Sequence, residues 1–198
     1  MSKKQTSRPK IEQSSKDDDP EFKKICLVSD CEKFVEAGEL PSERDLRKLT
    51  EGIISIYDDS LNEDNLRKRA VDVVCDLARR YDEVLDIVIE NAQKYADAQH
   101  IDDASPYSPN SFNILAKVGK GNEKVISFLG QTVQTNWGTP RWAATEALCE
   151  LDDSKADTII IGIINGKYPP KHLDCAWDIR KIERIKGQKF VERHHSNN

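Results

Sequence analysis

Few side chains in this 198-residue sequence have the types and spacing that catalysis or metal binding requires. His100, His172, His194 and His195 stand neither in an HExxH motif nor at a paired His/Cys spacing, so we expect no metal site. The segment Gly119-Lys120-Gly121-Asn122 lacks the GxxxxGK[ST] spacing and a preceding strand, which favours a helix-breaking linker over a phosphate-binding loop. No set of acid, base and nucleophile residues points to an enzyme, and no cofactor is predicted.

The tryptophans stand beside turns or charged residues, and they are the strongest candidates for a binding surface. Tryptophan and arginine are enriched at binding hot spots, where a partner desolvates large side chains. Trp137 lies in a turn and is expected to be partly exposed, whereas Trp142 and Trp177 could instead be core residues. The predicted binding residues are Trp137, Arg141, Trp142, Trp177, Asp178 and Arg180.

The charge distribution limits the classes of partner. Charged residues make up 33% of the chain, which suits an elongated shape with much surface. The net charge of −5 argues against nucleic acid, since phosphate binding requires a cationic surface. Residues 167–198 contain eight Lys/Arg and four Asp/Glu, or +4, which leaves −9 for residues 1–166. The basic end could contact an acidic partner, or it could be a solvated helix end.

Cysteine usage and hydropathy indicate the compartment. The cysteines form no CxxC pair and most lie on or near an apolar stripe of a helical pattern, which favours buried free thiols. Residues 1–20 lack the apolar segment of a signal peptide, and no stretch approaches the roughly 20 apolar residues that cross a bilayer. We therefore expect a cytoplasmic protein that is not inserted in a membrane.

The chain divides into a domain and two tails. Apart from Met1, residues 1–18 contain one large apolar residue, Ile11, and are predicted to form a disordered polar tail. Residues 19–187 are predicted to form a helical domain, followed by a C-terminal tail at 188–198. The domain begins at Asp19-Pro20-Glu21, where Asp can cap a helix, Pro fits its first position and Glu favours its positive end.

Apolar residues in the domain recur at three- and four-residue steps, which predicts an all-α fold. The β-branched run at 158–164 could be a strand, but helix is favoured because the sequence offers no second strand for it to pair with. The last helix is predicted from Pro169-Pro170 to Gly187. The predicted breaks between helices fall at residues 38–41, 58–61, 80–82, 97–108, 119–121, 136–138, 152–153 and 166–168.

Three segments of the sequence align at offsets of 41 and 33 residues. Two-helix repeats of roughly 30 to 45 residues are typical of α-solenoids, because one helix pair cannot bury its own apolar face whereas stacked pairs share a core. We therefore predict a short α-solenoid of antiparallel helix pairs with about four repeats; the alternative is a chance alignment of amphipathic helices. The aligned positions are Val74, Leu115 and Leu148; Leu77, Val118 and Leu151; and Leu85, Ile126 and Ile159.

Residues 139–165 resemble a HEAT repeat of the short bacterial, phycobilisome-lyase-like type. In that family a Pro or polar residue opens the first helix, Arg-x-Ala-Ala leads to a Leu, and an Asp-rich turn precedes an apolar second helix. The matching residues are Thr139-Pro140, Arg141-Trp142-Ala143-Ala144, Leu148, Leu151 and Asp152-Asp153. The resemblance extends over residues 62–187, although the copy at 109–135 lacks the Arg-Ala pair. It implies a HEAT-like architecture more than an activity, because fold and function are separable.

The leading functional prediction is a non-enzymatic HEAT-like adaptor, assembly factor or regulatory subunit whose partner is another protein. The resemblance also implies two enzymatic alternatives, a phycobilin lyase-like protein and a DNA glycosylase-like protein. The enzymatic alternatives require Asp178 and a tryptophan to line one cleft. A further alternative is nucleic-acid binding through the basic residues near the C-terminus, Arg180, Lys181, Arg184, Lys186, Lys189 and Arg193.

Overall fold

The computed structural model describes residues 20–37, 42, 46–52, 54, 64–98, 110–168 and 175–195. All regular secondary structure within these residues is helical, which confirms the all-α prediction. The predicted tail at residues 1–18, most of the loop at 97–108 and the helix start at Pro169-Pro170 lie outside the described residues.

Connections of one to four residues separate α3 from α4, α5 from α6, α6 from α7, α7 from α8 and α9 from α10. Residues 46–52 form a further short helical segment between α1 and α3. In the described part of the chain, none of the helices combines the length and apolar character needed to cross a bilayer. The bounds are α1 (Pro20–Ala37), α3 (Asp64–Arg80), α4 (Asp82–Ala98), α5 (Asn110–Val118), α6 (Glu123–Thr135), α7 (Thr139–Glu150), α8 (Ser154–Ile164), α9 (Cys175–Lys186) and α10 (Gln188–His194).

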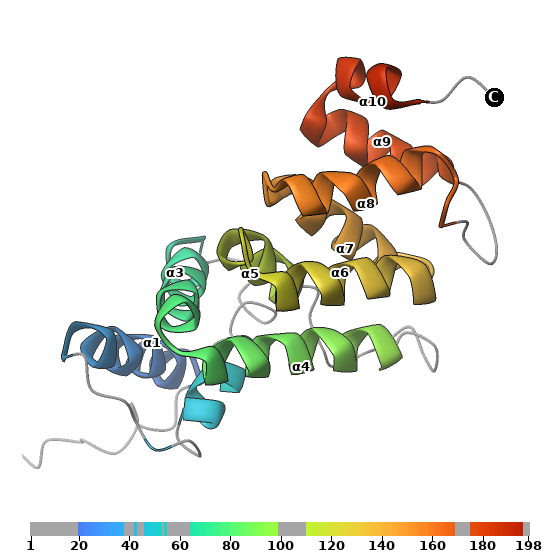
Figure 1. The fold of residues 1–198 in the computed structure, drawn as a ribbon. Coiled ribbons are helices and arrows are strands. Elements are labelled where there is room, and N and C mark those ends of the chain that lie inside the picture. Colours follow the sequence, from blue (N-terminus) through green and yellow to red (C-terminus); the bar gives the residue numbers. More distant parts are fainter. Residues whose placement is uncertain are drawn as a thin grey trace, which may run out of the picture.

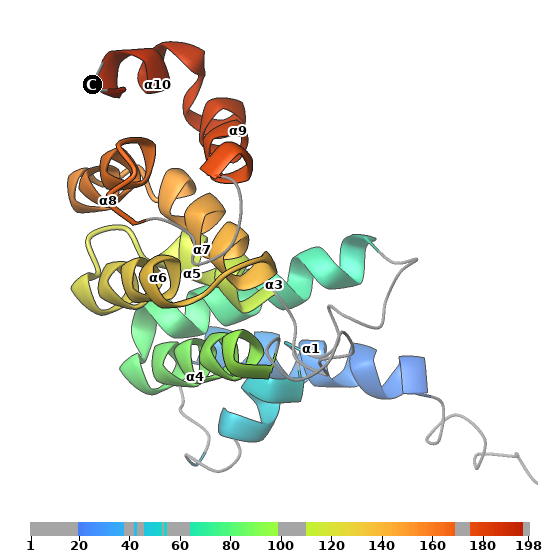
Figure 2. The ribbon, with the colours of Figure 1, turned by 90° about the vertical axis from the view of Figure 1, so that its right-hand side faces the viewer.

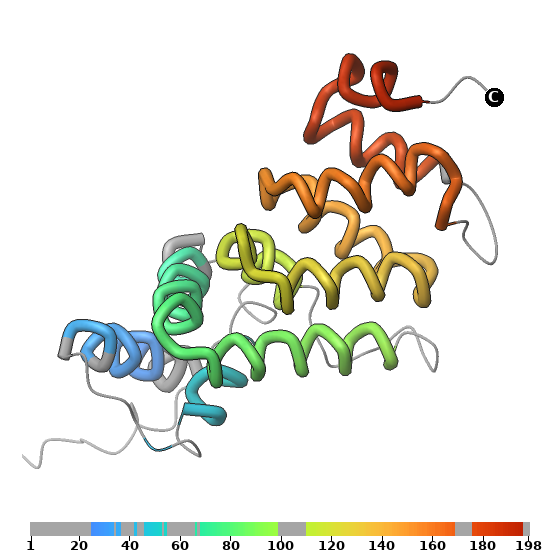
Figure 3. The backbone as a smooth tube through the Cα atoms, viewed as in Figure 1, coloured from blue at the N-terminus to red at the C-terminus, as the bar shows by residue number. Residues whose placement is uncertain are grey.

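From α3 onward the helices lie in two layers (Figure 2). In one layer α3 contacts α5, α5 contacts α7 and α7 contacts α9; in the other α4 contacts α6, α6 contacts α8 and α8 contacts α10. The chain advances in one direction from α1 to α10, so that these two helices lie at opposite ends of the molecule (Figures 1 and 3). Each helix pair therefore contacts the pairs before and after it.

Side-chain caps set the starts of two helices. The Asn122 side chain accepts from the backbone N–H groups of Lys124 and Val125 at 3.0 and 3.2 Å and begins α6. Oδ1 of Asp153 accepts from the N–H of Lys155 at 2.8 Å and begins α8. These contacts satisfy N–H groups that have no partner within the helix. The predicted breaks at 119–121 and 152–153 are confirmed.

The β-branched run at 158–164 is helical within α8, as predicted. A Cβ atom added at Gly162 would lie 2.6 Å from Cε2 of Tyr168, so the absence of a side chain there makes room for the tyrosine ring. At Gly130 in α6 an added Cβ atom would lie 2.8 Å from Cδ1 of Ile159 in α8. The two glycines allow close packing against α8.

The apolar positions that align in the three sequence segments belong to the hydrophobic core of the described residues. Burying a large aliphatic side chain stabilises a fold by about 1.5 to 3 kcal/mol. These side chains come from several helices and belong to one continuous hydrophobic cluster. Buried are Val74, Leu77, Leu85, Leu115, Ile126, Leu148 and Leu151, and partly buried are Val118 and Ile159.

The C-terminal end differs from the prediction. Residues 188–194, which the polar sequence assigns to a tail, form α10 in contact with α8 and α9. Val191 is buried and Phe190 packs against the core. Gly187, with φ 87°, separates α10 from α9. The predicted tail is wrong over these residues, because two adjacent apolar side chains suffice to pack a short helix onto its neighbours.

Candidate functional site

Arg141, in the first turn of α7, is a buried cation with three bonded partners. Its Nε donates to Oδ2 of Asp178 in α9 at 2.7 Å. Nη1 donates to the carbonyl of Val133 in α6 and Nη2 to the carbonyl of Tyr168 after α8, each at 2.6 Å. The guanidinium therefore joins four segments of the chain. A carboxylate and two carbonyls compensate the loss of its hydration.

Arg141 and Asp178 are predicted above to contact a partner, and the structure corrects this expectation. Each side chain is only 2% exposed, so a bound molecule cannot reach the guanidinium or the carboxylate while α7 and α9 are in contact. Asp178 therefore does not line an open cleft beside a tryptophan, which the enzymatic alternatives require. The pair instead holds α7 against α9.

Trp142 and Trp177, the sequence neighbours of this ion pair, meet at the surface. Their ring centroids are 5.6 Å apart and their planes are inclined by 36°. Trp142 is partly buried, whereas Trp177 is 53% exposed. Because both rings extend from the helices that the ion pair joins, the separation of the rings depends on the ion pair beneath them.

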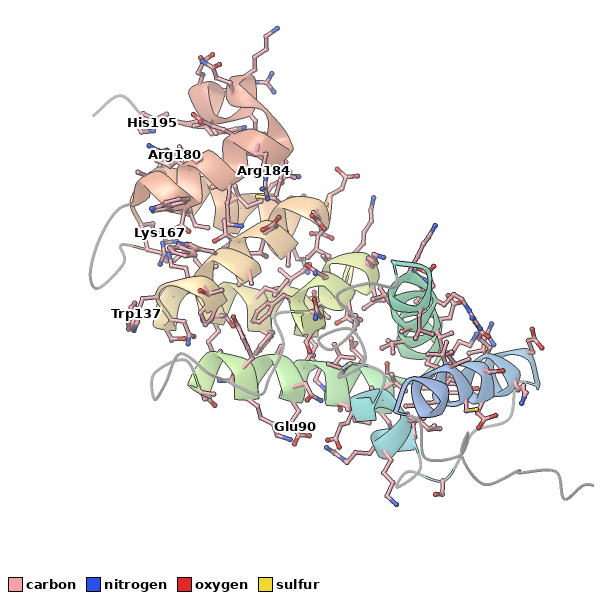
Figure 4. All side chains as sticks on the ribbon, turned by 180° about the vertical axis from the view of Figure 1, so that it is seen from behind. Glu90, Trp137, Lys167, Arg180, Arg184 and His195 are labelled. Atoms are coloured by element: carbon pink, nitrogen blue, oxygen red, sulfur yellow. The ribbon has the colours of Figure 1, made fainter. Side chains whose placement is uncertain are left out.

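Two cations lie against aromatic rings near this stack. The guanidinium carbon of Arg180 is 5.7 Å from the ring centroid of Trp177, and Nζ of Lys167 is 5.4 Å from that of Tyr168. Trp137, in the turn between α6 and α7, is 49% exposed, which agrees with its predicted partial exposure. Figure 4 shows Trp137, Lys167 and Arg180 along one edge of the molecule. We define the tryptophan edge as Trp137, Trp142, Lys167, Tyr168, Trp177 and Arg180.

Half of the basic residues predicted for nucleic-acid binding are paired with carboxylates of this chain. Lys181 and Arg184 both bind Glu146 of α7. Nζ of Lys186 lies 3.0 Å from Oδ1 of Asp157 in α8. These contacts hold α9 onto the preceding helix pair and neutralise three of the predicted cations.

The buried thiols are chemically inert. Burial raises the pKa of Cys31 to about 12, of Cys75 to about 11 and of Cys149 to about 12. Thiols with such pKa values stay protonated at neutral pH and are poor nucleophiles. Cys26 is exposed, which corrects the expectation of burial for this residue, and the side chain of Cys175 lies outside the described part of the chain.

A pocket of about 300 Å³ lies between α1 and α3, at the other end of the molecule. Three of its carboxylates are engaged: Glu32 binds Arg69 through two hydrogen bonds of 2.9 and 2.6 Å, Asp76 binds Arg79 at 2.9 Å, and Asp72 pairs with Lys117 at 3.8 Å. Among the described residues no three His, Cys, Asp or Glu side chains converge in a way that could hold a metal ion. The tryptophan edge is therefore the stronger candidate site.

Sequence reasoning missed Lys167 and Tyr168 as members of the edge. The signal that could have indicated them is Gly162, since a glycine within a run of isoleucines marks a place where a helix accommodates a large side chain. The sequence does not tell which side chain fills that place. Tyr168 reaches it because the chain turns back onto α8 at Asn165 and Gly166.

Comparison of the chain with protein-family models, curated proteins and solved structures finds no match.

Proposed function

We propose that this chain is a HEAT-like protein-binding module, a short α-solenoid of about four helix pairs that binds another protein through the tryptophan edge. The two-layer order of the helices supports the solenoid, since each pair contacts the next in both layers. The burial of the aligned apolar positions supports it as well. An adaptor, an assembly factor and a regulatory subunit would all use such a module.

Polar contacts between equivalent parts of successive pairs give further support. Asp86 near the start of α4 pairs with Lys124 at the start of α6, and Glu123 of α6 pairs with Lys155 at the start of α8. Contacts that recur at the same end of successive helices are expected of neighbouring repeats.

The turns between the helices of successive pairs also contact each other. The N–H of Gly121, in the turn before α6, donates to Oδ2 of Asp153, in the turn before α8, at 3.0 Å. Lys120 and Asp152 of the same two turns form an ion pair of 3.1 Å. The turns are therefore in register, which supports a regular repeat.

The observation that carries the binding function is the exposure of two indole rings on one edge. Trp137 is 49% and Trp177 53% exposed, although each indole could bury a large apolar area. Trp177 is held at the surface by its stack on Trp142 and by the ion pair beneath it. Rigid exposed aromatic rings are the side chains from which binding hot spots are built.

The enzymatic alternatives have less support. Both need an accessible acid or nucleophile, whereas Asp178 is bound to Arg141 and the thiols of Cys31, Cys75 and Cys149 are buried. The nucleic-acid alternative is weakened by the pairing of Lys181, Arg184 and Lys186.

The proposal is tested by comparing the proteins that three immobilised chains retain from a host-cell extract. The chains are the wild type, the double variant Trp137→Ala/Trp177→Ala and the control Ile25→Ala. Ile25 suits the control because it is 41% exposed on α1, at the opposite end of the molecule. We expect quantitative mass spectrometry to find a set of proteins retained by the wild type and the control and lost from the double variant. Retention of the same proteins by all three chains would overturn the proposal.

A further inference from the structure

We propose that the partner segment bound by the tryptophan edge is an acidic peptide, in which carboxylates stand beside a large apolar side chain. This inference rests on the proposed protein-binding function and specifies the chemistry of the ligand. It follows from where the unpaired cations of the described residues lie.

Most cations of the described residues are paired within the chain. Arg47, Arg69, Lys117, Lys124 and Lys155, for example, each have a carboxylate on another helix within 4.0 Å. Four of the seven exceptions among the described residues follow α8, in a chain whose net charge is −5. The described Lys and Arg side chains without a carboxylate partner are Lys48, Lys68, Arg80, Lys167, Arg180, Lys189 and Arg193.

Two of these free cations belong to the tryptophan edge. Arg180 and Lys167 are positioned by the rings of Trp177 and Tyr168. Contact with an aromatic face leaves the charge and the N–H groups of a cation available to an anion. An arginine held in this way loses little side-chain entropy when it binds a carboxylate, because its position is already restricted.

Two carboxylates on α7 and α9, the helices of the edge, are engaged by other cations of the chain. Asp178 is buried against Arg141, and Glu146 is shared by Lys181 and Arg184. No residue of the edge is acidic. A partner carboxylate can therefore bind Arg180 or Lys167, while an adjacent apolar side chain packs on the exposed part of Trp177.

An acidic peptide fits this surface better than a nucleic acid does. Binding of a phosphate backbone requires many cations along a track, because each phosphate contact releases counterions. The edge offers two free cations, and the chain as a whole is negative. Two cations and two exposed indoles match a ligand that has a few carboxylates next to an apolar side chain. The test must distinguish binding of such a peptide from binding of a single-stranded oligonucleotide.

The test selects ligands from a library of random peptides displayed on phage against the purified full-length chain. The selected peptides are then measured by fluorescence polarisation, together with their Asp→Asn and Glu→Gln counterparts and a labelled oligonucleotide of random sequence. The proteins are the wild type, Trp177→Ala, Arg180→Ala, Lys167→Ala and, as matched controls, Lys48→Ala and Lys68→Ala. Circular dichroism verifies that every variant is folded.

We expect the selected peptides to be enriched in Asp and Glu next to an aromatic or aliphatic residue. Trp177→Ala should weaken their binding about 30-fold or more, as the loss of a hot-spot residue does. Arg180→Ala and Lys167→Ala should each weaken it about tenfold and reduce its dependence on salt, and neutralising the peptide should have a similar effect. Lys48→Ala and Lys68→Ala should change it by about twofold at most.

The outcomes distinguish the inference from the proposed function. Selected peptides that are not acidic, but still depend on Trp177, would overturn the inference and leave the protein-binding function standing. Peptides that bind equally well to Trp177→Ala, or a selection that yields no binder, would overturn both. Tighter binding of the oligonucleotide than of any peptide, with the same dependence on Trp177 and Arg180, would replace the acidic peptide by a nucleic acid.

Discussion

The guanidinium of Arg141 donates from Nε to Oδ2 of Asp178 at 2.7 Å, in a contact closed to solvent between α7 and α9. The residues next to them in the sequence, Trp142 and Trp177, form a stack at the surface of the same two helices. One pair of helices therefore carries a structural contact on its inner side and the candidate binding residues on its outer side. The buried ion pair of Arg141 and Asp178 therefore determines how Trp142 and Trp177 are positioned at the surface.

Replacing Arg141 by Met should lower the free energy of unfolding by about 3 to 5 kcal/mol, because the change leaves the Asp178 carboxylate buried without a counterion. The measurement is urea unfolding followed by circular dichroism. Asp178→Leu alone should be similarly costly, whereas the double variant Arg141→Met/Asp178→Leu should lose less than the sum of the two. A loss below about 1 kcal/mol for Arg141→Met, the range of an exposed ion pair, would contradict the buried contact.

The stacked indoles should give a coupled signal in the circular dichroism spectrum, since their ring centroids are 5.6 Å apart. Trp142→Phe and Trp177→Phe should each abolish the signal, because coupling requires both rings. Trp137→Phe should preserve it, because Trp137 is not part of the stack. Asp178→Asn should weaken the signal if the ion pair positions the rings. A signal that survives Trp142→Phe would refute the stack.

Asn122→Ala should destabilise the fold by about 1 kcal/mol, since the side chain caps α6 through the N–H groups of Lys124 and Val125. Asn113→Ala is the matched control, because Asn113 is exposed within α5 and its replacement should be neutral or slightly stabilising. Thermal unfolding of both variants provides the measurement. Equal stability of the two variants would show that Asn122 does not act as a cap.

The thiols of Cys31, Cys75 and Cys149 should resist modification in the folded chain, because burial raises their pKa values to about 12, 11 and 12. The measurement uses the variant Cys26→Ser/Cys175→Ser and a disulfide reagent at pH 8. We expect no reaction in buffer and full reaction of the three thiols in denaturant. Rapid labelling of any of them in buffer would contradict the packing of its helix.

Local signals predict much of the fold. The caps at Asn122 and Asp153 act on N–H groups within three residues, so the helix starts follow from the sequence alone. The aligned positions represented by Val74, Leu115 and Leu148 also predict the core, because apolar periodicity depends on which face of a helix is buried.

The burial of Arg141 could not be predicted in the same way. Its counterion Asp178 is 37 residues away, and one of its carbonyl partners belongs to Tyr168, 27 residues away. An arginine beside a tryptophan at the start of a helix is also typical of a binding surface, so the local pattern favours exposure. Whether Arg141 is buried or exposed is decided only by the packing of α9 on α7. The predicted C-terminal tail was wrong for a related reason. Val191 is buried where α10 contacts α8 and α9, and the local sequence does not reveal contacts between helices.

The central claim is that a protein segment binds the edge formed by Trp177 and Arg180, and photo-crosslinking tests it most directly. A photoreactive amino acid replaces Ala176, which is exposed beside Trp177 on α9, or, as the control, Ile25 on α1. The account predicts crosslinks from position 176, but not from position 25, to acidic segments of a partner protein identified by mass spectrometry. Crosslinks to the same molecules from both positions, or none from position 176, would contradict it.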